Sequence, residues 1–518
     1  MLQTASDWIM LVTIILYMGF MVSIGISVSK KNKTADDFDL GGRRLGPLVT
    51  AMSAEASDMS GWLLMGLPAV ALMGGLPEAV WTAVGLAIGT YLNWLFVSRR
   101  LRVYSNRLGA CTLPDFFARR FGTGTKPLTV VAALMIIVFF IPYTASGFAA
   151  CGKLFSSLFG IGYVPAMILS AAVIVLYCTL GGFLAASTTD FVQSIIMTIA
   201  LFVVVGFGEG MVHGFENVFA SVKPLDGYLD LFRGYNVAAG TTSSYGALPV
   251  ASTLAWGLGY FGMPHILLRF MAIEDENKLK TSRRVASVWV VISMGVAVLI
   301  GVIGYAMMNS GILPTYADAS SAETVIVDIS RVLSGFGIVP SLVAGIILAG
   351  ILASTMSTAD SQLLAAASSV SQNLIVETFG FKLSQKTNMW LARAAVVVIS
   401  VVAVFLALDP NASVFRIVSF AWAGFGAVFG PLMLLSLFWK RVNKYGALAG
   451  MLTGGVMIFV WKFVIRVAFA GTWLDIYELL PAFLLSLAVT VIVSLATKAP
   501  DKEVTDVFDA VKAECVGK

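Results

Sequence analysis

Long apolar runs recur along almost the whole chain and set the strongest limit on how it can fold. Each run of about 18 to 25 residues is long enough to cross a hydrocarbon core about 30 Å thick as one helix. Only 12% of the 518 residues are charged and the mean hydropathy is +0.88, whereas soluble domains carry roughly 25% charged residues. The sequence therefore predicts an all-α polytopic membrane protein with a single transporter-sized domain over residues 1–518 in the lipid bilayer.

The apolar runs and their charged flanks predict about thirteen membrane spans. Their approximate bounds are 7–28, 47–74, 79–98, 127–152, 163–182, 190–208, 246–270, 285–309, 340–362, 390–408, 413–437, 445–466 and 478–497. The first run is preceded by an aspartate and followed by lysines, the reverse of a secretory signal, so we expect it to be retained. The long connection 209–245 is interpreted either as a plain connector or as a gate.

Basic residues gather in the connections that this span order places on one side. These connections and the tail 498–518 hold 26 of the 34 Lys and Arg residues, which predicts an outside N-terminus and a cytoplasmic C-terminus. The net charge of +5 follows from these loops and gives no reason to expect a nucleic-acid partner. The four cysteines lack metal-type spacing and no hydrolase or nucleotide-binding motif occurs, so an enzyme is not indicated.

Two of the predicted spans are interrupted. The second breaks at 55–61, inside the polar stretch 53–62, and the seventh breaks at the glycine-rich stretch 256–264. Broken helices are tolerated in membranes only where the break is buried or lines a cavity. The breaks lie about 200 residues and five spans apart, which is typical of transporters built from two inverted repeats with discontinuous helices 2 and 7. We place the repeats at 47–208 and 246–437, so that spans 2–11 form the core.

The first break carries two carboxylates, Glu55 and Asp58. Carboxylates are costly in hydrocarbon and usually mark an ion or substrate path, so both should face a cavity. The half-helix after the break would direct the amides of Ser60, Gly61 and Trp62 at a substrate carboxylate, and the half-helix before it would offer the carbonyls of Ala56 and Met59 to a cation. The alternative is that the serines here only hydrogen-bond their own helix.

A run of hydroxyl residues at 354–361 lies in the apolar ninth span. Ser354 and either Ser357 or Thr358 share one helix face, and neutral oxygens of this kind suit a monovalent ion such as sodium. The alternative is small-residue packing between helices. Asp190, at the start of the sixth span, is either a helix cap or part of a second ion site.

Aromatic residues cluster at the two breaks. Beside the breaks or on the presumed cavity lie Trp62, Tyr143, Trp256, Tyr260 and Phe261. Such residues also serve as packing or interface residues in membrane proteins. No Arg or Lys lies around the breaks, which favours a small zwitterionic solute over one with an anionic side group.

Six motifs, in order over about residues 5–500, resemble the sodium–solute symporter family. They are LGGRRLGP at 40–47, ASDMSGW at 56–62, TLPDF at 112–116, GGFLA at 181–185, WGLGYFG at 256–262 and AWAGFG at 421–426. The wording is similar to that of the proline-transporting members. The resemblance implies a leucine-transporter-type fold of thirteen spans and sodium-coupled uptake of L-proline by alternating access across the bacterial inner (plasma) membrane. Na⁺ would be the coupling ion, with no organic cofactor.

The resemblance also implies residue roles. The main sodium site would use the carbonyls of Ala56 and Met59 and the hydroxyls of Ser357 and Thr358, with Asp58 needed for sodium coupling. A second sodium site of some relatives matches Asp190, Ser354, Ser357 and Thr358. Proline-site positions match Ser60, Trp62, Tyr143, Trp256, Tyr260 and Pro264, beside the Gly61 amide. Departures from the wording of the family are Glu55, which has no assigned role, Met263 and Asp360.

Other functions stay open at this point. The solute could be a monocarboxylate, a vitamin or a sugar, and a proton could replace sodium through Glu55 or Asp58. A transporter-like sensor would be expected to carry an output domain, whereas the tail after Thr497 has only about 20 residues.

Overall fold

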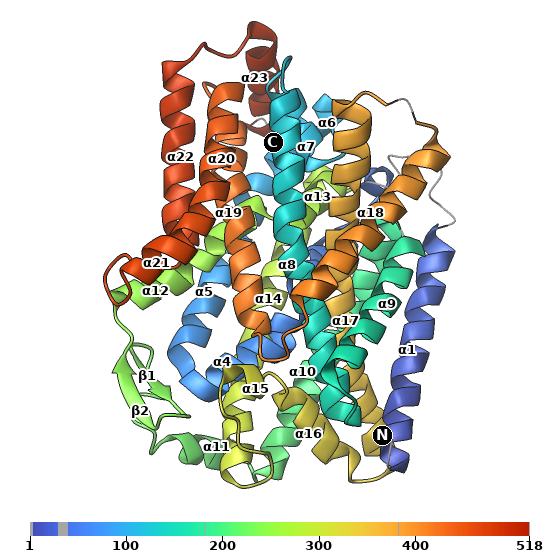
Figure 1. Cartoon of the computed structure of the whole chain (residues 1–518), viewed down its shortest axis with the longest axis vertical. Helices are drawn as coiled ribbons and strands as arrows, with labels where there is room; N and C mark the ends of the chain where they lie inside the picture. The colour runs from blue at the N-terminus through green and yellow to red at the C-terminus, as the bar shows by residue number, and fades with distance from the viewer. Residues whose placement is uncertain (1–3, 30–39, 181, 382, 517–518) are drawn as a thin grey trace.

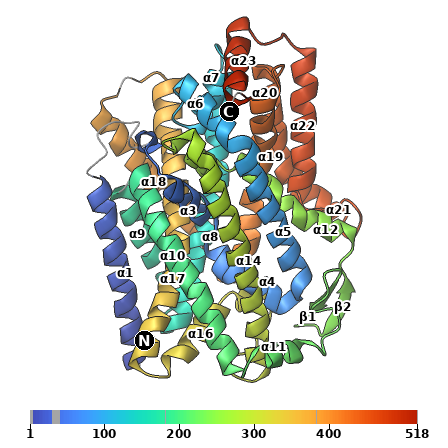
Figure 2. The same cartoon turned by 180° about the vertical axis from the view of Figure 1, so that it is seen from behind.

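The computed structural model describes residues 4–29, 40–180, 182–381 and 383–516, and Figures 1 and 2 show a bundle of long helices running in roughly one direction. The first half of the chain contains α1 (Ala5–Ser29), α3 (Pro47–Asp58), α4 (Leu67–Gly74), α5 (Leu76–Leu92), α6 (Ser98–Leu108), α7 (Leu113–Arg120), α8 (Lys126–Phe159), α9 (Tyr163–Leu180), α10 (Phe183–Met211), α11 (Phe215–Val222) and the strands β1 (Arg233–Asn236) and β2 (Thr241–Ser244). Short 3-10 or π segments are η1 (Gly41–Arg43), η2 (Trp62–Gly66) and η3 (Asn93–Val97).

The second half is equally helical. It contains α12 (Ala247–Leu254), α13 (Pro264–Ala272), α14 (Leu279–Asn309), α15 (Ala319–Ala322), α16 (Val325–Ser334), α17 (Ile338–Ser368), α18 (Gln385–Leu406), α19 (Val414–Phe438), α20 (Lys444–Val460), α21 (Arg466–Ala468), α22 (Leu479–Ala496) and α23 (Lys502–Val516). The short segments are η4 (Ala255–Gly262), η5 (Glu276–Lys278), η6 (Ser369–Thr378) and η7 (Trp461–Ile465).

Within the described residues, ten helices are long and apolar enough to span a membrane, or eleven if α3 and the helix after it form one bent span. The all-helical membrane class is therefore confirmed. The other two predicted spans correspond to α9, which has a shorter apolar part, and to the interrupted stretch α12–η4–α13. The total of thirteen spans stays a prediction.

Both predicted breaks are present. The first helix ends at Asp58 and restarts at Trp62 with a bend of 61°. The second changes from α12 to the 3-10 segment η4, and Met263 is extended before α13 begins at Pro264. Gly259 belongs at this break because a Cβ there would lie 2.0 Å from the Trp422 indole nitrogen on α19. The second broken helix can therefore pack closely on α19 only with glycine at this position.

The helices differ strongly in burial. In α19, 83% of the most apolar part of the helix is buried, whereas in α1 the fraction is 28%. The central helices around the two breaks therefore form the core, and α1 lies at the edge of the bundle, as Figure 1 also shows. All four cysteines are free, so no disulfide joins the helices.

The long connection 209–245 is folded onto the bundle. It contains α11 and the antiparallel hairpin β1–β2, in which Arg233 pairs with Ser244. The Leu76 amide donates to the Tyr228 carbonyl at 2.8 Å, and the Tyr228 hydroxyl donates to the Ala71 carbonyl at 2.8 Å. These bonds fix the connection to the junction of α4 and α5, at the same end of the bundle as the start of α1 (Figure 1).

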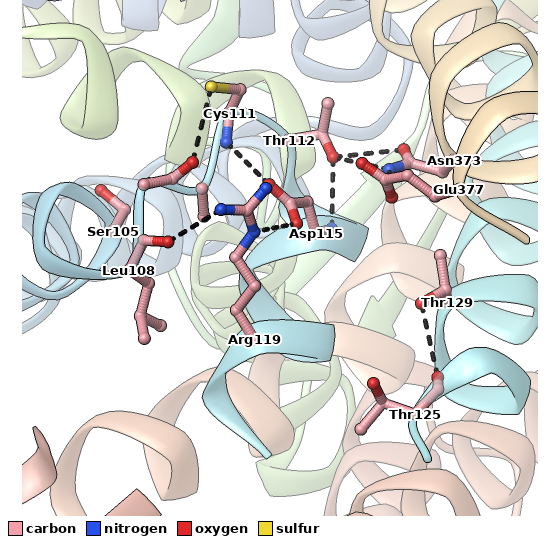
Figure 3. A network of polar contacts seen from close by, with 12 residues as sticks. Ser105, Leu108, Cys111, Thr112, Asp115, Arg119, Thr125, Thr129, Asn373 and Glu377 are labelled. Carbon is pink, nitrogen blue, oxygen red and sulfur yellow. Dashed lines mark hydrogen bonds and ion pairs between the residues drawn. The ribbon is translucent and has the colours of Figure 1, made fainter. Parts of the chain in front are cut away.

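Among the described residues, the basic residues of α6, α7 and the start of α20 lie at the opposite end of the bundle, together with α23. Arg107 forms an ion pair with Glu514 at 2.8 Å, and the Lys444 amine donates to the Thr123 carbonyl at 2.8 Å. Figure 3 shows the polar network at the start of α7, where Asp115 pairs with Arg119 at 2.5 Å. The start of α1 and the end of α23 lie at opposite ends of the bundle (Figure 1), as an odd number of spans requires.

Candidate ion and solute site

Asp58, the last residue of α3, is the centre of the first break and is fully buried. Its carboxylate oxygen Oδ2 accepts a hydrogen bond from the Tyr260 hydroxyl at 2.7 Å. Its backbone carbonyl accepts from the Tyr143 hydroxyl at 3.0 Å and from the Trp62 indole at 3.1 Å. The two broken helices and α8 therefore meet at this residue, as the hydropathy pattern predicts for discontinuous helices.

Several polar atoms at this break are left for a ligand. Among the described residues, Asp58 Oδ1 and the Ser60 hydroxyl are buried and have no hydrogen-bond partner. The Ser60 amide is not the free donor that the sequence predicts, because it donates to the Asp58 carbonyl at 2.9 Å. Buried polar atoms that lack partners are costly, so these two oxygens, together with the unpartnered second carboxylate oxygen of Glu55, are candidates for contact with a bound ion or solute.

The predicted sodium ligands come together in part. The Ser357 hydroxyl on α17 lies 2.8 Å from the Ala56 carbonyl on α3 and 3.1 Å from the Ser354 carbonyl. The Thr358 hydroxyl donates to the Ser354 carbonyl at 3.0 Å. Hydroxyl and carbonyl oxygens from two helices thus converge beside the end of α3, and hard oxygen ligands of this kind suit a monovalent cation. The Met59 sulfur accepts a hydrogen bond from the Ser293 hydroxyl at 3.5 Å, and the Met59 amide donates to the Glu55 carbonyl at 2.9 Å.

Aromatic side chains surround the second break. The ring centroids of Trp62 and Trp256 lie 6.1 Å apart, and Trp256 stacks on Tyr477 at 5.7 Å. The Trp422 indole donates to the Trp256 carbonyl at 2.7 Å and its ring meets Tyr260 edge-on at 5.0 Å. These contacts join three of the predicted aromatics, Trp62, Trp256 and Tyr260, to Trp422 and Tyr477 in one aromatic layer.

A cavity of about 430 Å³ lies beside Trp256. Trp256, Phe415 and Tyr477 are among its lining residues, as are charged residues of both signs, including Glu78 and Arg416, which lie 3.3 Å apart. Cavities of this size hold small solutes, and mixed charges suit a zwitterion. Trp256 is connected to Asp58 through Trp62, whose ring it contacts and whose indole donates to the Asp58 carbonyl.

Asp190 lies in a second polar cluster, in which Arg269 joins it to the Ser361 hydroxyl of α17. Its Oδ2 accepts from the Ser53 hydroxyl at 2.7 Å and from the Arg269 guanidinium at 3.1 Å. Pro264, a predicted proline-site position, starts α13 and shares with Arg269 and Ser361 a small cavity of about 20 Å³. Asp190 and Pro264 thus both lie beside Arg269.

Glu55, which had no assigned role, accepts a hydrogen bond from the Trp94 indole at 2.8 Å and is fully buried. Its second carboxylate oxygen has no partner among the described residues. Sequence reasoning missed Trp94 and also Arg269, although an arginine inside an apolar segment is itself a signal of function. The expectation that no basic residue lies near the breaks is therefore wrong for the folded chain, because the Arg269 guanidinium contacts Ser53 on α3 at 3.0 Å.

Solved structures share this arrangement of helices. A sodium-coupled sialic acid symporter in a substrate-bound outward-open state superposes with a TM-score of 0.77, covering 95% of this chain and 99% of that chain at 18% identity. The nucleobase-cation-symport transporter Mhp1 in a closed conformation gives a TM-score of 0.52, with 92% of this chain and 99% of that chain covered at 14% identity. At such low identity these likenesses concern the fold alone, and they confirm the predicted leucine-transporter-type fold.

Similar sequences cover nearly the whole chain. The osmoregulated proline transporter OpuE of Bacillus subtilis is 42% identical over 490 residues, 94% of each chain. The sodium/proline symporter of Escherichia coli K12 is 40% identical over 493 residues, 95% of this chain and 94% of its own. The profile of the Sodium:solute symporter family matches residues 38–454. A profile match over most of the chain and relatives of this identity show that the chain belongs to the sodium:solute symporter family, whose members are transporters and not enzymes.

Proposed function

We propose that the chain is a secondary active transporter that couples sodium entry to the uptake of L-proline by alternating access. The observation that carries the proposal is the similarity of about 40% over nearly the full length to proteins named as proline transporters. The burial of a carboxylate and hydroxyls at two helix breaks supports it independently, since such groups mark ion and substrate paths in membranes.

The ion site is assigned to the end of α3 and the facing part of α17. Ala56 and Ser357, whose oxygens lie 2.8 Å apart, are its centre, with Met59 and Thr358 as the further ligands. When sodium binds between two such oxygens, it would replace their mutual hydrogen bond. Asp58 would serve coupling, because its unpartnered carboxylate oxygen lies in the same break.

The solute site is assigned to the region between Asp58 and the aromatic layer. Ser60, Gly61 and Trp62 would bind the carboxylate side, while Tyr143, Trp256 and Tyr260 would enclose the ring, with Pro264 on the inner side. Gly61 has a packing reason as well, because a Cβ there would lie 2.8 Å from the Ala150 Cβ. The assignment accounts for a compact zwitterion with an apolar ring.

The proposed topology has the N-terminus outside and the C-terminus in the cytoplasm of a bacterial inner membrane, with repeats at 47–208 and 246–437 and a cytoplasmic tail at 498–518. The gathering of the basic connections around α23 at one end of the bundle supports this sidedness.

The test is uptake of labelled proline into proteoliposomes that hold the purified full chain. An inward sodium gradient should drive uptake, and a proton gradient alone should not. A panel of other solutes should not compete with proline for uptake. One sodium ion crossing 100 mV supplies about 2.3 kcal/mol, and a tenfold sodium gradient about 1.4 kcal/mol more. The sum of about 3.7 kcal/mol corresponds to roughly 500-fold accumulation. The absence of sodium-stimulated proline uptake would refute the proposal.

A further inference from the structure

The cavity beside Trp256 is built from two parts of the chain. The predicted core of the two repeats contributes Glu78 of α5, Trp256 of η4 and Arg416 of α19. The connection between α20 and α22, which follows the second predicted repeat, contributes Lys462, Tyr477 and Glu478. The helices after the core therefore help to form a cavity of about 430 Å³, a size that suits a small solute.

The charged rim of this cavity lies away from the C-terminal helix. α20 begins and α22 ends at the end of the bundle that holds α23, so the connection between them lies at their opposite ends (Figure 1). The Arg416 side chain is 68% exposed and the Glu78 side chain 31%, which leaves this part of the cavity accessible to water. In the proposed topology a solute would therefore reach the cavity from outside.

Part of the cavity wall is aromatic. The Trp256 ring lies 5.1 Å from that of Phe415 and stacks on that of Tyr477 at 5.7 Å, both measured between ring centroids. Tyr477 is held in place because its hydroxyl donates to the Ser419 carbonyl at 2.6 Å and its amide donates to the Ser252 hydroxyl at 3.1 Å. Aromatic faces attract cations and bury apolar surface, so this wall fits a cyclic ammonium compound.

The charged residues of the connection between α20 and α22 form a fixed cluster. Glu478 is 1% exposed, and its two carboxylate oxygens lie 3.3 Å from the Lys462 ammonium and 2.7 Å from the Arg466 guanidinium. Arg466 also pairs with Asp475 at 3.1 Å. Among the described residues, the other attractive contact of the Lys462 ammonium is with the Phe420 ring, 4.6 Å from its centroid. An ammonium has three donors, so Lys462 keeps one for a further anionic group.

The ion pair of Arg416 and Glu78 is looser. Its atoms lie 3.3 Å apart and both side chains are partly exposed. Exposed ion pairs contribute little to stability, because water screens the charges and long side chains must be ordered. A zwitterion can exchange this pair for two, with its carboxylate on Arg416 and its ammonium on Glu78. The exchange leaves no charge in the cavity without a partner.

The cavity is distinct from the site at the first break. Asp58, Ser60 and Tyr260 are not among the described residues that line it. Trp256 belongs to both places, since it lines the cavity and its ring lies 6.1 Å from that of Trp62. A solute in the cavity therefore has charged contacts different from those of a solute bound beside Asp58.

We propose that this cavity is a second solute site, which binds a small zwitterion with an apolar ring before the solute reaches the break at Asp58. The carboxylate binds Arg416 and Lys462, the ammonium binds Glu78, and the ring packs on Trp256. The proposal rests on the proposed uptake of proline and deepens it. It also gives the helices after the core a function, because they provide part of the site.

The experiment counts proline molecules on the purified full chain in detergent, by equilibrium dialysis of labelled L-proline at saturating sodium. It compares the wild type with E78Q/R416Q, which removes both charges of the loose pair and leaves the net charge unchanged. The matched control is D226N/R233Q, because Asp226 and Arg233 also form an exposed ion pair, at the start of β1 and outside the cavity lining. We expect two molecules bound by the wild type and by the control, and one by E78Q/R416Q, whose affinity at the second site should fall at least about tenfold.

A wild type that binds a single proline would overturn the inference. It would also fall if E78Q/R416Q still binds two molecules with wild-type affinity, or if the control loses the second molecule as well. If E78Q/R416Q does not fold, the wild-type count still decides whether a second site exists.

The outcome is separate from that of the uptake test. One molecule bound together with sodium-driven accumulation would refute the second site and leave the proposed function standing. Two molecules bound without sodium-driven uptake would refute the proposed coupling and support the second site.

Discussion

Replacing Ser357 by alanine tests the ion site most directly. The change removes one hydroxyl oxygen, which lies 2.8 Å from the Ala56 carbonyl and bridges α17 to α3. It leaves the helix backbone and the apolar packing nearly unchanged. A polar contact to a charged group is worth about 1.5 to 3 kcal/mol, which corresponds to sodium binding about 13 to 160 times weaker.

The assay is sodium-dependent uptake of labelled proline into proteoliposomes, with the sodium concentration for half-maximal rate measured at fixed membrane potential. S357A should raise that concentration by the factor given above, while the proline affinity at saturating sodium changes little. The matched control is S371A on the continuation of the same helix, because the Ser371 hydroxyl is buried but bonds only its own helix, to the Ala367 carbonyl at 2.9 Å.

The reasoning fails if S357A keeps its half-saturating sodium concentration within twofold of the wild type. It fails equally if S371A shifts that concentration as much as S357A does, because the effect would then come from general helix weakening. A loss of protein in the membrane is separated from a loss of binding by size-exclusion chromatography of each purified variant.

Four further predictions follow from named contacts. W256A should weaken proline affinity and leave the sodium dependence nearly intact, because the Trp256 ring lines the cavity of about 430 Å³ and contacts Trp62. Competition binding of proline measures the change in affinity. D58N should abolish the sodium stimulation of uptake, since it removes the charge of the buried carboxylate; stimulation equal to wild type would contradict the assignment. K153M should lower the midpoint of thermal unfolding in detergent, because it strips the 2.6 Å partner from buried Glu323, a loss worth about 3 to 5 kcal/mol. Asp318 caps the helix α15 by accepting a hydrogen bond from the Ser321 amide, and this bond lowers the pKa of the Asp318 carboxyl. The cap should therefore hold at neutral pH and weaken as the pH falls through that lowered pKa. Hydrogen exchange of residues 318–323 at decreasing pH tests this prediction.

A large part of the architecture was predictable from the chain alone. Apolar length fixes helices in a membrane, because no other open structure satisfies its backbone there. Glycine, proline and carboxylates inside such a run are costly, so the positions of both breaks could be read from residues in sequence order, and Asp58 and the hydroxyl run could be named as candidates for an ion site. Those are local properties, and local properties are what a sequence pattern reports.

The pairing of groups that lie far apart in the chain was decided only by the tertiary structure. Nothing in the sequence order indicates that Asp190 faces Arg269, 79 residues later, or that Trp94 serves Glu55. A carboxylate and a serine are equally compatible with a sodium cage or with a guanidinium partner, and the choice depends on which side chains the helix packing brings within about 3 Å. The sequence by itself therefore determined where the membrane helices break and which groups could bind an ion, whereas the fold determined which of those groups the protein has already paired with its own charges.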